Sequence, residues 1–418
     1  MAGFDFKAKV KMKKVKSQVT MLMIVGLVLF IIVSLVLYLS KSAVKKQSQQ
    51  SIKKTQETAI DTQPIKEFVN KCVDKLAKDA VVLLGKQGGY IYASQGGTLV
   101  DYSDTDEGLF FVKYNNYNVA YNIFPPKFTV PPYSSEIPDY PWPTFPYKTA
   151  NENAEIFDGF FGISNLPPLN SSEGSNSIQT QIETFIDHNI AGCADLSLFK
   201  SQGYEIDVGS SKTQVTIGSR DVRVKSEMPI KITNLAAKET TEIKDFSTEI
   251  KINLRDSYLL VKGIIENDIK NIKFGINDTE NNKDPVKIKL IKNIFSDDIK
   301  KIKTDLLIVT DQESLVYGKP FEYIFARRNR APALYYIKTN AFSFPDGYLI
   351  NKSDLLQNKP LRADDPDEDN YIYNIYVGEF GQSLAQFPKK LNVQQIKFRV
   401  EVSDGQLRDY QMLTVNRI

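Results

Sequence analysis

The stretch Val19–Leu39, VTMLMIVGLVLFIIVSLVLYL, decides how the rest of the chain is arranged. It carries no charged residue over its whole length. The hydrocarbon core of a bilayer is roughly 30 Å thick and takes about 20 helical residues, so this stretch is long enough to span it. The sequence therefore predicts a transmembrane helix at 19–39, with the chain from Ser40 onward on one side of the membrane.

Charge on the two sides of this span predicts its orientation. Residues 1–18 form a basic segment with six lysines, at positions 7, 9, 11, 13, 14 and 16, against three lysines just after the span, at 41, 45 and 46. Lysines collect on the cytoplasmic side of membrane spans. We therefore expect a single-pass protein of the cell membrane with a cytoplasmic N-terminus and the bulk of the chain extracellular.

A second interpretation of the same region is proteolytic processing. The sequence KKVKSQVTMLMIVGLVLF resembles the leader of archaeal type IV pilins and archaellins, in which a peptidase cuts before a Gln that opens the apolar helix. The resemblance implies a cut between Ser17 and Gln18, although the family has Gly where Ser17 stands. An uncleaved anchor is the preferred interpretation, and a pilin-like filament subunit is the alternative.

Composition and cysteine content fit a tethered ectodomain. Charged residues make up 25% of the chain and the net charge is +3, too close to balance to indicate nucleic acid as a partner. The two cysteines, Cys72 and Cys193, both follow the span, and outside the cytoplasm such a pair most simply forms one disulfide. The alternative is two buried free thiols.

The region after the span divides into a linker and two α+β segments. Residues 40–63 are polar and predict a stalk or linker, and residues 64–202 predict a domain with two amphipathic helices. One helix, IKEFVNKCVDKLAKDAVVLLG, carries Cys72, and the other, IETFIDHNIAGC, ends at Cys193. Between them, the proline- and aromatic-rich segment 125–146 predicts an extended loop wrapped over the core. Residues 203–328 alternate with period two and predict a β-rich α+β domain with one helix at 255–271.

The two cysteine-bearing helices resemble a pair found in a group of uncharacterised archaeal single-pass surface proteins. The resemblance covers roughly residues 18 to 210. It implies surface display and no known activity.

The C-terminal segment 329–418 carries three motifs in order: NRAPAL at 329–334, LRADDPDEDNYIYNI at 361–375 and IKFRVEVSDGQLRDYQMLTV at 396–415. They resemble the cadherin-like and immunoglobulin-like domains of prokaryotic surface proteins, with Glu368 where that family has Gly. The resemblance implies a β-sandwich, and the short alternating strands agree. The fold class we expect is α+β, with an N-terminal transmembrane helix, an extracytoplasmic α+β region and a C-terminal immunoglobulin-like β-sandwich.

The acidic loops of this sandwich are the candidate metal site, with calcium as the candidate cofactor. In a sandwich of this topology the two acidic loops lie at one end, near Arg327 and Asn329. Calcium takes 6 to 8 oxygen ligands, and five carboxylates are candidates: Asp364, Asp365, Asp367, Asp369 and Asp404. Two alternatives remain open: the acids only form tight turns, or Arg327, Arg328 or Arg330 neutralises them.

Signatures of catalysis are absent from the sequence, which has one histidine, no G-x-S-x-G and no H-E-x-x-H. We therefore expect a membrane-anchored surface protein with a structural or adhesive role and no catalysis. Its partners would be the membrane, and other surface proteins, glycans or copies of itself. A pilin-like subunit is one alternative, and a carboxylate-dependent surface hydrolase is another, because glycoside hydrolysis needs only two acids.

Overall fold

The structure is a computed structural model that describes residues 60–102, 110–125, 161–276, 284–295, 302–334, 342–357, 362–378, 381–383, 389–390 and 392–418. The predicted span at 19–39, the processing residues Ser17 and Gln18, and all but the first residue of the proline-rich segment lie outside these ranges. Within them, no helix is both long and apolar enough to cross a membrane.

Two helices form the centre of the part of the structure that precedes the C-terminal segment. They are α2 (Gln63–Lys86) and α4 (Ile178–Cys193). Pro64 lies in the first turn of α2, where a missing N–H costs no hydrogen bond, and the side chain of Ser177 accepts a hydrogen bond from the Thr180 amide to cap α4. A disulfide joins Cys72 to Cys193, whose Cα atoms are 5.7 Å apart. Both helices and the bridge between them confirm the sequence prediction.

An antiparallel sheet covers these helices on one side. Its strands are β4 (Tyr204–Val208), β5 (Lys212–Ile217), β6 (Val222–Asn234) and β7 (Glu239–Ile250). The long strand β6 pairs with the other three, and its residues alternate between buried and exposed. This alternation is what places one face of the sheet on the helices.

A second, mixed sheet lies on the other side of α2. It has the order β1-β2-β10-β9-β8, with β3 pairing to β2, and only the β2–β10 pairing is parallel. The bounds are β1 (Phe111–Tyr114), β2 (Tyr117–Phe124), β3 (Ile163–Ser164), β8 (Val286–Phe295), β9 (Lys303–Val316) and β10 (Lys319–Arg328). The described part of the body also contains the 3₁₀ turn η1 (Ala93–Gln95), the short helix α5 (Ser197–Ser201) and the long helix α6 (Leu254–Lys270).

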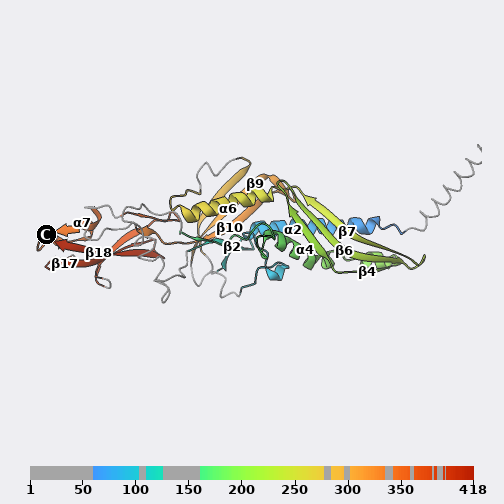
Figure 1. Ribbon diagram of the computed structural model, residues 1–418, viewed down its shortest axis with the longest axis horizontal. Helices are drawn as coiled ribbons and strands as arrows, with labels where there is room; N and C mark the ends of the chain where they lie inside the picture. The colour runs from blue at the N-terminus through green and yellow to red at the C-terminus, as the bar shows by residue number, and fades with distance from the viewer. Residues whose placement is uncertain are drawn as a thin grey trace, which may run out of the picture.

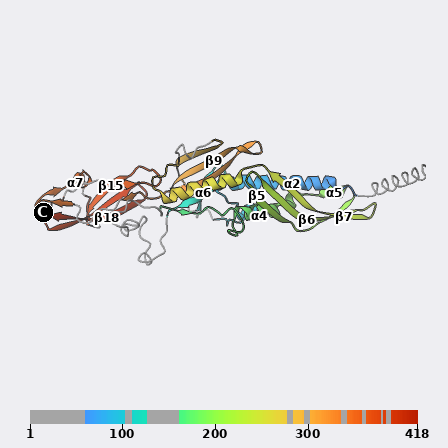
Figure 2. The ribbon, with the colours of Figure 1, turned by 45° about the horizontal axis from the view of Figure 1, so that its top comes forward.

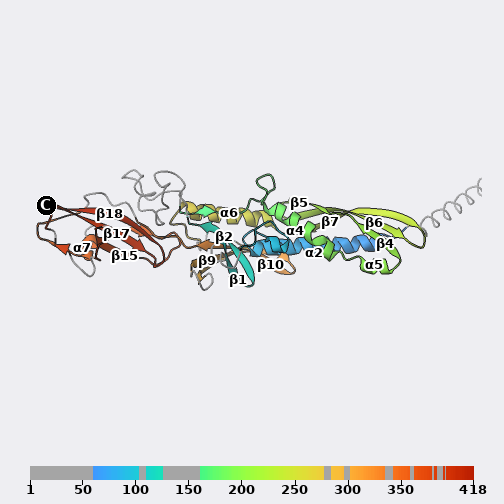
Figure 3. The same ribbon diagram turned by 90° about the horizontal axis from the view of Figure 1, so that it is seen from below.

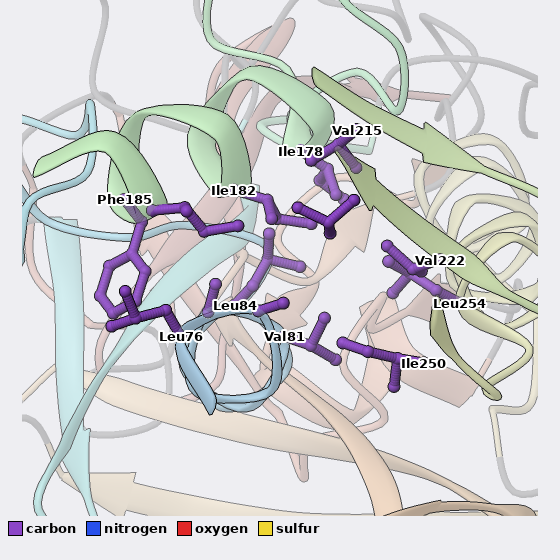
Figure 4. Packing of buried hydrophobic residues seen from close by; sticks show 14 of the residues in the cluster. Leu76, Val81, Leu84, Ile178, Ile182, Phe185, Val215, Val222, Ile250 and Leu254 are labelled. Atoms are coloured by element: carbon purple, nitrogen blue, oxygen red, sulfur yellow. The ribbon is translucent and has the colours of Figure 1, made fainter. Parts of the chain in front are cut away.

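One hydrophobic core joins the helices to both sheets. In Figure 4, Leu84 of α2 and Ile182 of α4 pack together, and Val222, Ile250 and Leu254 lie beside them. The same cluster continues to Phe325 in β10. The described residues between 64 and 328, on both sides of the boundary that we expect at 202/203, therefore share one core, and we call them the body.

The C-terminal segment has its own core, built around Phe398 and Val400. Its main sheet has the order β12-β18-β17-β15, and two short strand pairs, β11–β14 and β13–β16, flank it together with α7. The bounds are β11 (Ala333–Leu334), β12 (Phe342–Phe344), β13 (Leu349–Ile350), α7 (Lys352–Gln357), β14 (Ala363–Asp364), β15 (Ile372–Val377), β16 (Lys389–Lys390), β17 (Gln395–Ser403) and β18 (Arg408–Arg417). The expected α+β class with a sandwich-like C-terminal part is thus confirmed.

The described elements follow one another along a long axis. Figures 1, 2 and 3 show α2 and the β6–β7 hairpin towards one end, α6 and β10 in the middle, and the C-terminal sheet at the other end. The connection from β10 to β11 is the place where the body meets the sandwich.

Candidate functional site

The two acidic loops of the sandwich both lie at this junction. One is the turn between β14 and β15, which holds Asp365 and Asp367, and the other is the β17–β18 hairpin, which holds Asp404. Asn329, one residue after β10, donates from Nδ2 to Asp404 Oδ2 at 2.7 Å. The prediction that the two loops share the end next to Asn329 is therefore confirmed.

Arg327 lies at the centre of the junction and is 2% exposed. Its Nη1 donates to Asp268 of α6 and its Nη2 to Asp305 of β9, both at 2.7 Å. Its Nε lies 3.1 Å from Asp367 Oδ1 in the sandwich turn. One side chain thus links a helix, a strand of the body and a loop of the sandwich.

Arg330 makes a second, equally buried set of contacts. Its Nε and Nη2 donate to Asp367 Oδ1 at 3.0 and 2.8 Å, and its backbone amide donates to the other oxygen of the same carboxylate. Nη2 also lies 2.9 Å from Asp268 Oδ2, and the carbonyls of Phe161 and Pro366 accept from the guanidinium at 3.0 and 2.7 Å. We call these five residues the junction cluster: Arg327, Arg330, Asp268, Asp305 and Asp367.

The charges of the junction cluster offset one another closely, with two guanidinium groups against three carboxylates. Burial by itself lowers the pKa of Arg327, but Asp268, Asp367 and Asp305 together outweigh it and raise that pKa above its usual value. Arg330 shows the same balance, with its pKa raised by Asp268 and Asp367. Both arginines therefore stay charged, which keeps the carboxylates paired in an environment with little water.

Core packing fixes where these side chains point. Asp268 lies on the apolar face of α6, one turn after Ile264 and Ile265, which are both buried. Asp305 lies next to buried Leu306 and Leu307 near the start of β9. Because helix and strand are held by their apolar neighbours, the carboxylates are presented to Arg327 without freedom to move away.

Lysines of the body hold the same loops from outside. Lys303 Nζ donates to the Asp404 carbonyl at 2.9 Å and to Asp369 Oδ2 at 3.3 Å. Lys292 Nζ donates to the carbonyls of Asp367 and Glu368 at 2.7 and 3.1 Å. The turn between β14 and β15 is therefore tied to strands β8 and β9 as well as to the arginines, and the β17–β18 hairpin is tied to β9 and to Asn329.

The carboxylates in this arrangement do not fit a calcium cage. Asp367 is occupied by the two arginines, and Asp404 Oδ1 accepts from the amides of Gln406 and Leu407. Asp369 pairs with Lys303, and Asp364 lies 3.7 Å from Lys273 Nζ. In the part of the chain that the structure describes, no group of three or more His, Cys, Asp or Glu residues is arranged to hold a metal ion. Calcium binding stays a prediction, and the geometry favours the arginine alternative.

Asp365 is the exception among these acids. Its Oδ1 accepts from the amides of Asp367 and Asp369 at 2.8 and 3.0 Å, which is the turn role expected of Asp. Its Oδ2 is buried without a hydrogen-bond partner among the described residues. Burial, with the nearby charge of Asp367, raises the pKa of Asp365 to about 7.

The sequence identified one half of this site and missed the other. The acidic loops and Arg330 lie in the motifs at 329–334, 361–375 and 396–415, and Arg327 lies two residues before the first of them, but Asp268 and Asp305 belong to no motif. A signal for Asp268 does exist, because a charged residue on the apolar face of a predicted helix must find a buried partner. Nothing in one sequence says which arginine that partner is.

Comparison with known proteins adds little to this site. No family model matches the sequence, and no curated protein matches it. Among solved structures, the chain has a weak likeness to the crystal structure of Drosophila N-cadherin EC1-4. The two are 11% identical over 52% of this chain and 67% of that chain, with a TM-score of 0.15. A likeness at that level carries no argument about function.

One polar cleft in the body has the acidic lining that carboxylate-dependent hydrolysis would need. Its volume is about 620 Å³, and five of its lining residues are acidic: Asp221, Glu249, Asp256, Asp311 and Glu313. The most buried, Asp311, accepts from Asn253 Nδ2 at 3.0 Å and from Ser314 Oγ at 2.6 Å, which holds the start of α6 against β9. Among the described residues that line the cleft, none is aromatic, so the lining offers no ring on which a sugar could stack.

Proposed function

We propose that this chain is a membrane-anchored cell-surface protein with a structural or adhesive role. In this role the body is a spacer, and the C-terminal sandwich is the part presented to other surface proteins, to glycans or to copies of the same chain. The membrane anchor is the apolar stretch 19–39, with the N-terminus in the cytoplasm.

The observation that carries the proposal is the junction cluster. Two domains joined by a short connection move relative to each other unless their interface resists it. Here Arg327 and Arg330 bind carboxylates from α6, β9 and the sandwich turn at once. This arrangement supports a body and sandwich that act as one extended unit, as a surface spacer requires.

A filament subunit cut before Gln18 is the alternative, and one experiment on the native chain separates the two. N-terminal sequencing of the mature membrane protein should begin at Met1 or Ala2 for an anchor and at Gln18 for a pilin-like subunit. In the same preparation, an antibody against the C-terminal sandwich should label intact cells. Labelling only after lysis would show that the sandwich is not on the outer surface, and the proposal would be wrong.

A further inference from the structure

The β6–β7 turn exposes apolar side chains at the end of the body. Leu235, Ala236, Ala237 and Lys238 are all exposed, and Leu235 is 57% exposed. Yet the turn is well held, because Asn234 Oδ1 accepts from the amides of Ala236 and Ala237 at 2.9 and 3.1 Å. Its side chains are therefore presented from a fixed backbone.

A second exposed leucine lies beside this turn. Leu198 in α5 is 64% exposed, and α5 leads into Gly203, whose carbonyl accepts from the Leu235 amide at 3.1 Å. The ring of Phe199, next to Leu198, packs 5.9 Å from the ring of Phe68 in α2. We call Leu198 and residues 235–238 the apolar tip.

The apolar tip reaches beyond the start of α2. The side chain of Asn70 in α2 accepts a hydrogen bond from the Ser247 amide of β7, so these two residues lie side by side along the long axis of the molecule. From there β7 runs nine residues back to Lys238, about 30 Å, and α2 runs seven residues back to Gln63, about 10 Å. The hairpin should thus pass the helix start by about 20 Å. Figures 1 and 3 show that the β6–β7 hairpin extends past the start of α2.

The length of chain between the predicted anchor and α2 matches this reach. The 23 residues 40–62 separate the apolar stretch 19–39 from the start of α2. A chain of that length spans about 26 Å root mean square as a flexible coil and about 35 Å as a helix. A tip that projects about 20 Å towards the anchor is therefore within the reach of a flexible linker and can contact the membrane surface.

We propose that the apolar tip docks on the lipid surface of the membrane that holds residues 19–39. This inference rests on the proposed function, because it needs the anchor. Leu198 and Leu235 enter the boundary between headgroups and acyl chains, and Lys200 and Lys238 face the lipid phosphates. Two leucines bind lipid weakly on their own, but the anchor makes the contact intramolecular, with an effective concentration in the millimolar range. Docking at this second point sets the direction in which the sandwich projects.

Fluorescence quenching on the full chain in vesicles tests the proposal. Both native cysteines are in the disulfide, so Leu235→Cys adds a single free thiol for an environment-sensitive dye. The vesicles contain phosphatidylcholine, phosphatidylglycerol and a lipid with a nitroxide near the top of its acyl chain. We expect a blue shift and a loss of fluorescence at position 235. The matched control, Leu349→Cys in β13, is 55% exposed at the other end of the molecule and should keep its fluorescence.

Three results would overturn the inference, and they separate it from the proposed function. If the chain floats with the vesicles but position 235 is quenched no more than position 349, the anchor stands and docking is wrong. If the blue shift of the dye at position 235 disappears when the protein is diluted within the vesicles, a second copy of the chain covers the tip instead of lipid. If the chain does not float with vesicles at all, the proposed function fails together with the inference.

Discussion

Replacing Arg327 with methionine should destabilise the junction far more than any exposed arginine does. Methionine keeps much of the side-chain length but removes the charge, leaving Asp268, Asp305 and Asp367 with Arg330 alone. Two hydrogen bonds of 2.7 Å to carboxylates are lost, each worth about 1.5–3 kcal/mol, and breaking a buried ion pair costs about 3–5 kcal/mol in general. We therefore expect a loss of about 4 kcal/mol in the free energy of unfolding.

The assay is thermal and chemical unfolding followed by circular dichroism and calorimetry. A loss of about 4 kcal/mol lowers the midpoint by about 10 °C for a unit of this size. Because the junction cluster is the most buried contact between the sandwich and the body, the wild-type protein should unfold in one transition and Arg327→Met in two. Arg327→Lys keeps the charge without the three-way contact and should fall between them.

The control is Arg417→Met in the same sandwich. Arg417 Nη1 also lies 3.0 Å from a carboxylate, that of Asp346, but the two side chains are 40% and 70% exposed. Exposed pairs of this kind contribute at most about 1 kcal/mol. If Arg327→Met shifts the midpoint no more than Arg417→Met, and a single transition remains, the junction cluster does not hold the two parts together.

Three further outcomes are expected. Asp365→Asn should flatten the pH dependence of stability. The pKa of Asp365 in the folded protein, about 7, exceeds its ordinary value of 3.8, so the wild type loses stability as the pH rises through 7. Unfolding midpoints of both proteins at pH 5 and pH 8 measure this difference. Joint replacement of Cys72 and Cys193 by alanine should cost about 4–5 kcal/mol in the chain-entropy model for a separation of 121 residues, seen as a lower midpoint than in the oxidised parent. Millimolar calcium should leave the melting temperature of the wild type unchanged; a rise that Asp367→Ala abolishes would show that the acidic loops rearrange around the metal.

Local pattern was enough to predict the elements of the body, and pairing between distant elements was not. The helices α2, α4 and α6 follow from apolar residues spaced three and four apart, and β6 follows from strict alternation. The parallel pairing of β2 with β10 joins Tyr121 to Ala326, far apart along the chain. No local signal reports such a pairing, and this is why the core shared by residues on both sides of 202/203 could not be predicted from the sequence.

The candidate site divides in the same way. Asp365 follows the local rule, because its side chain bonds amides two and four residues ahead. The role of Asp367 depends on Arg330, 37 residues before it, and on Arg327, which in turn depends on Asp268 and Asp305. Residue types alone left calcium, simple turns and arginine as alternatives, because all three suit an acidic loop. Only the positions of the guanidinium groups favour one of them.

A cation supplied by the chain differs from a bound metal in how it responds to the surroundings. The stabilisation from a metal grows with its concentration relative to its dissociation constant, so a calcium junction softens when calcium falls. A guanidinium such as that of Arg327 is covalently attached and, with its pKa raised by three carboxylates, remains charged over the physiological range. Its contribution therefore depends on folding alone. For a protein proposed to project a sandwich from a membrane, such a junction keeps its geometry whatever the ionic composition outside, and partner binding rather than calcium would be the variable that controls adhesion.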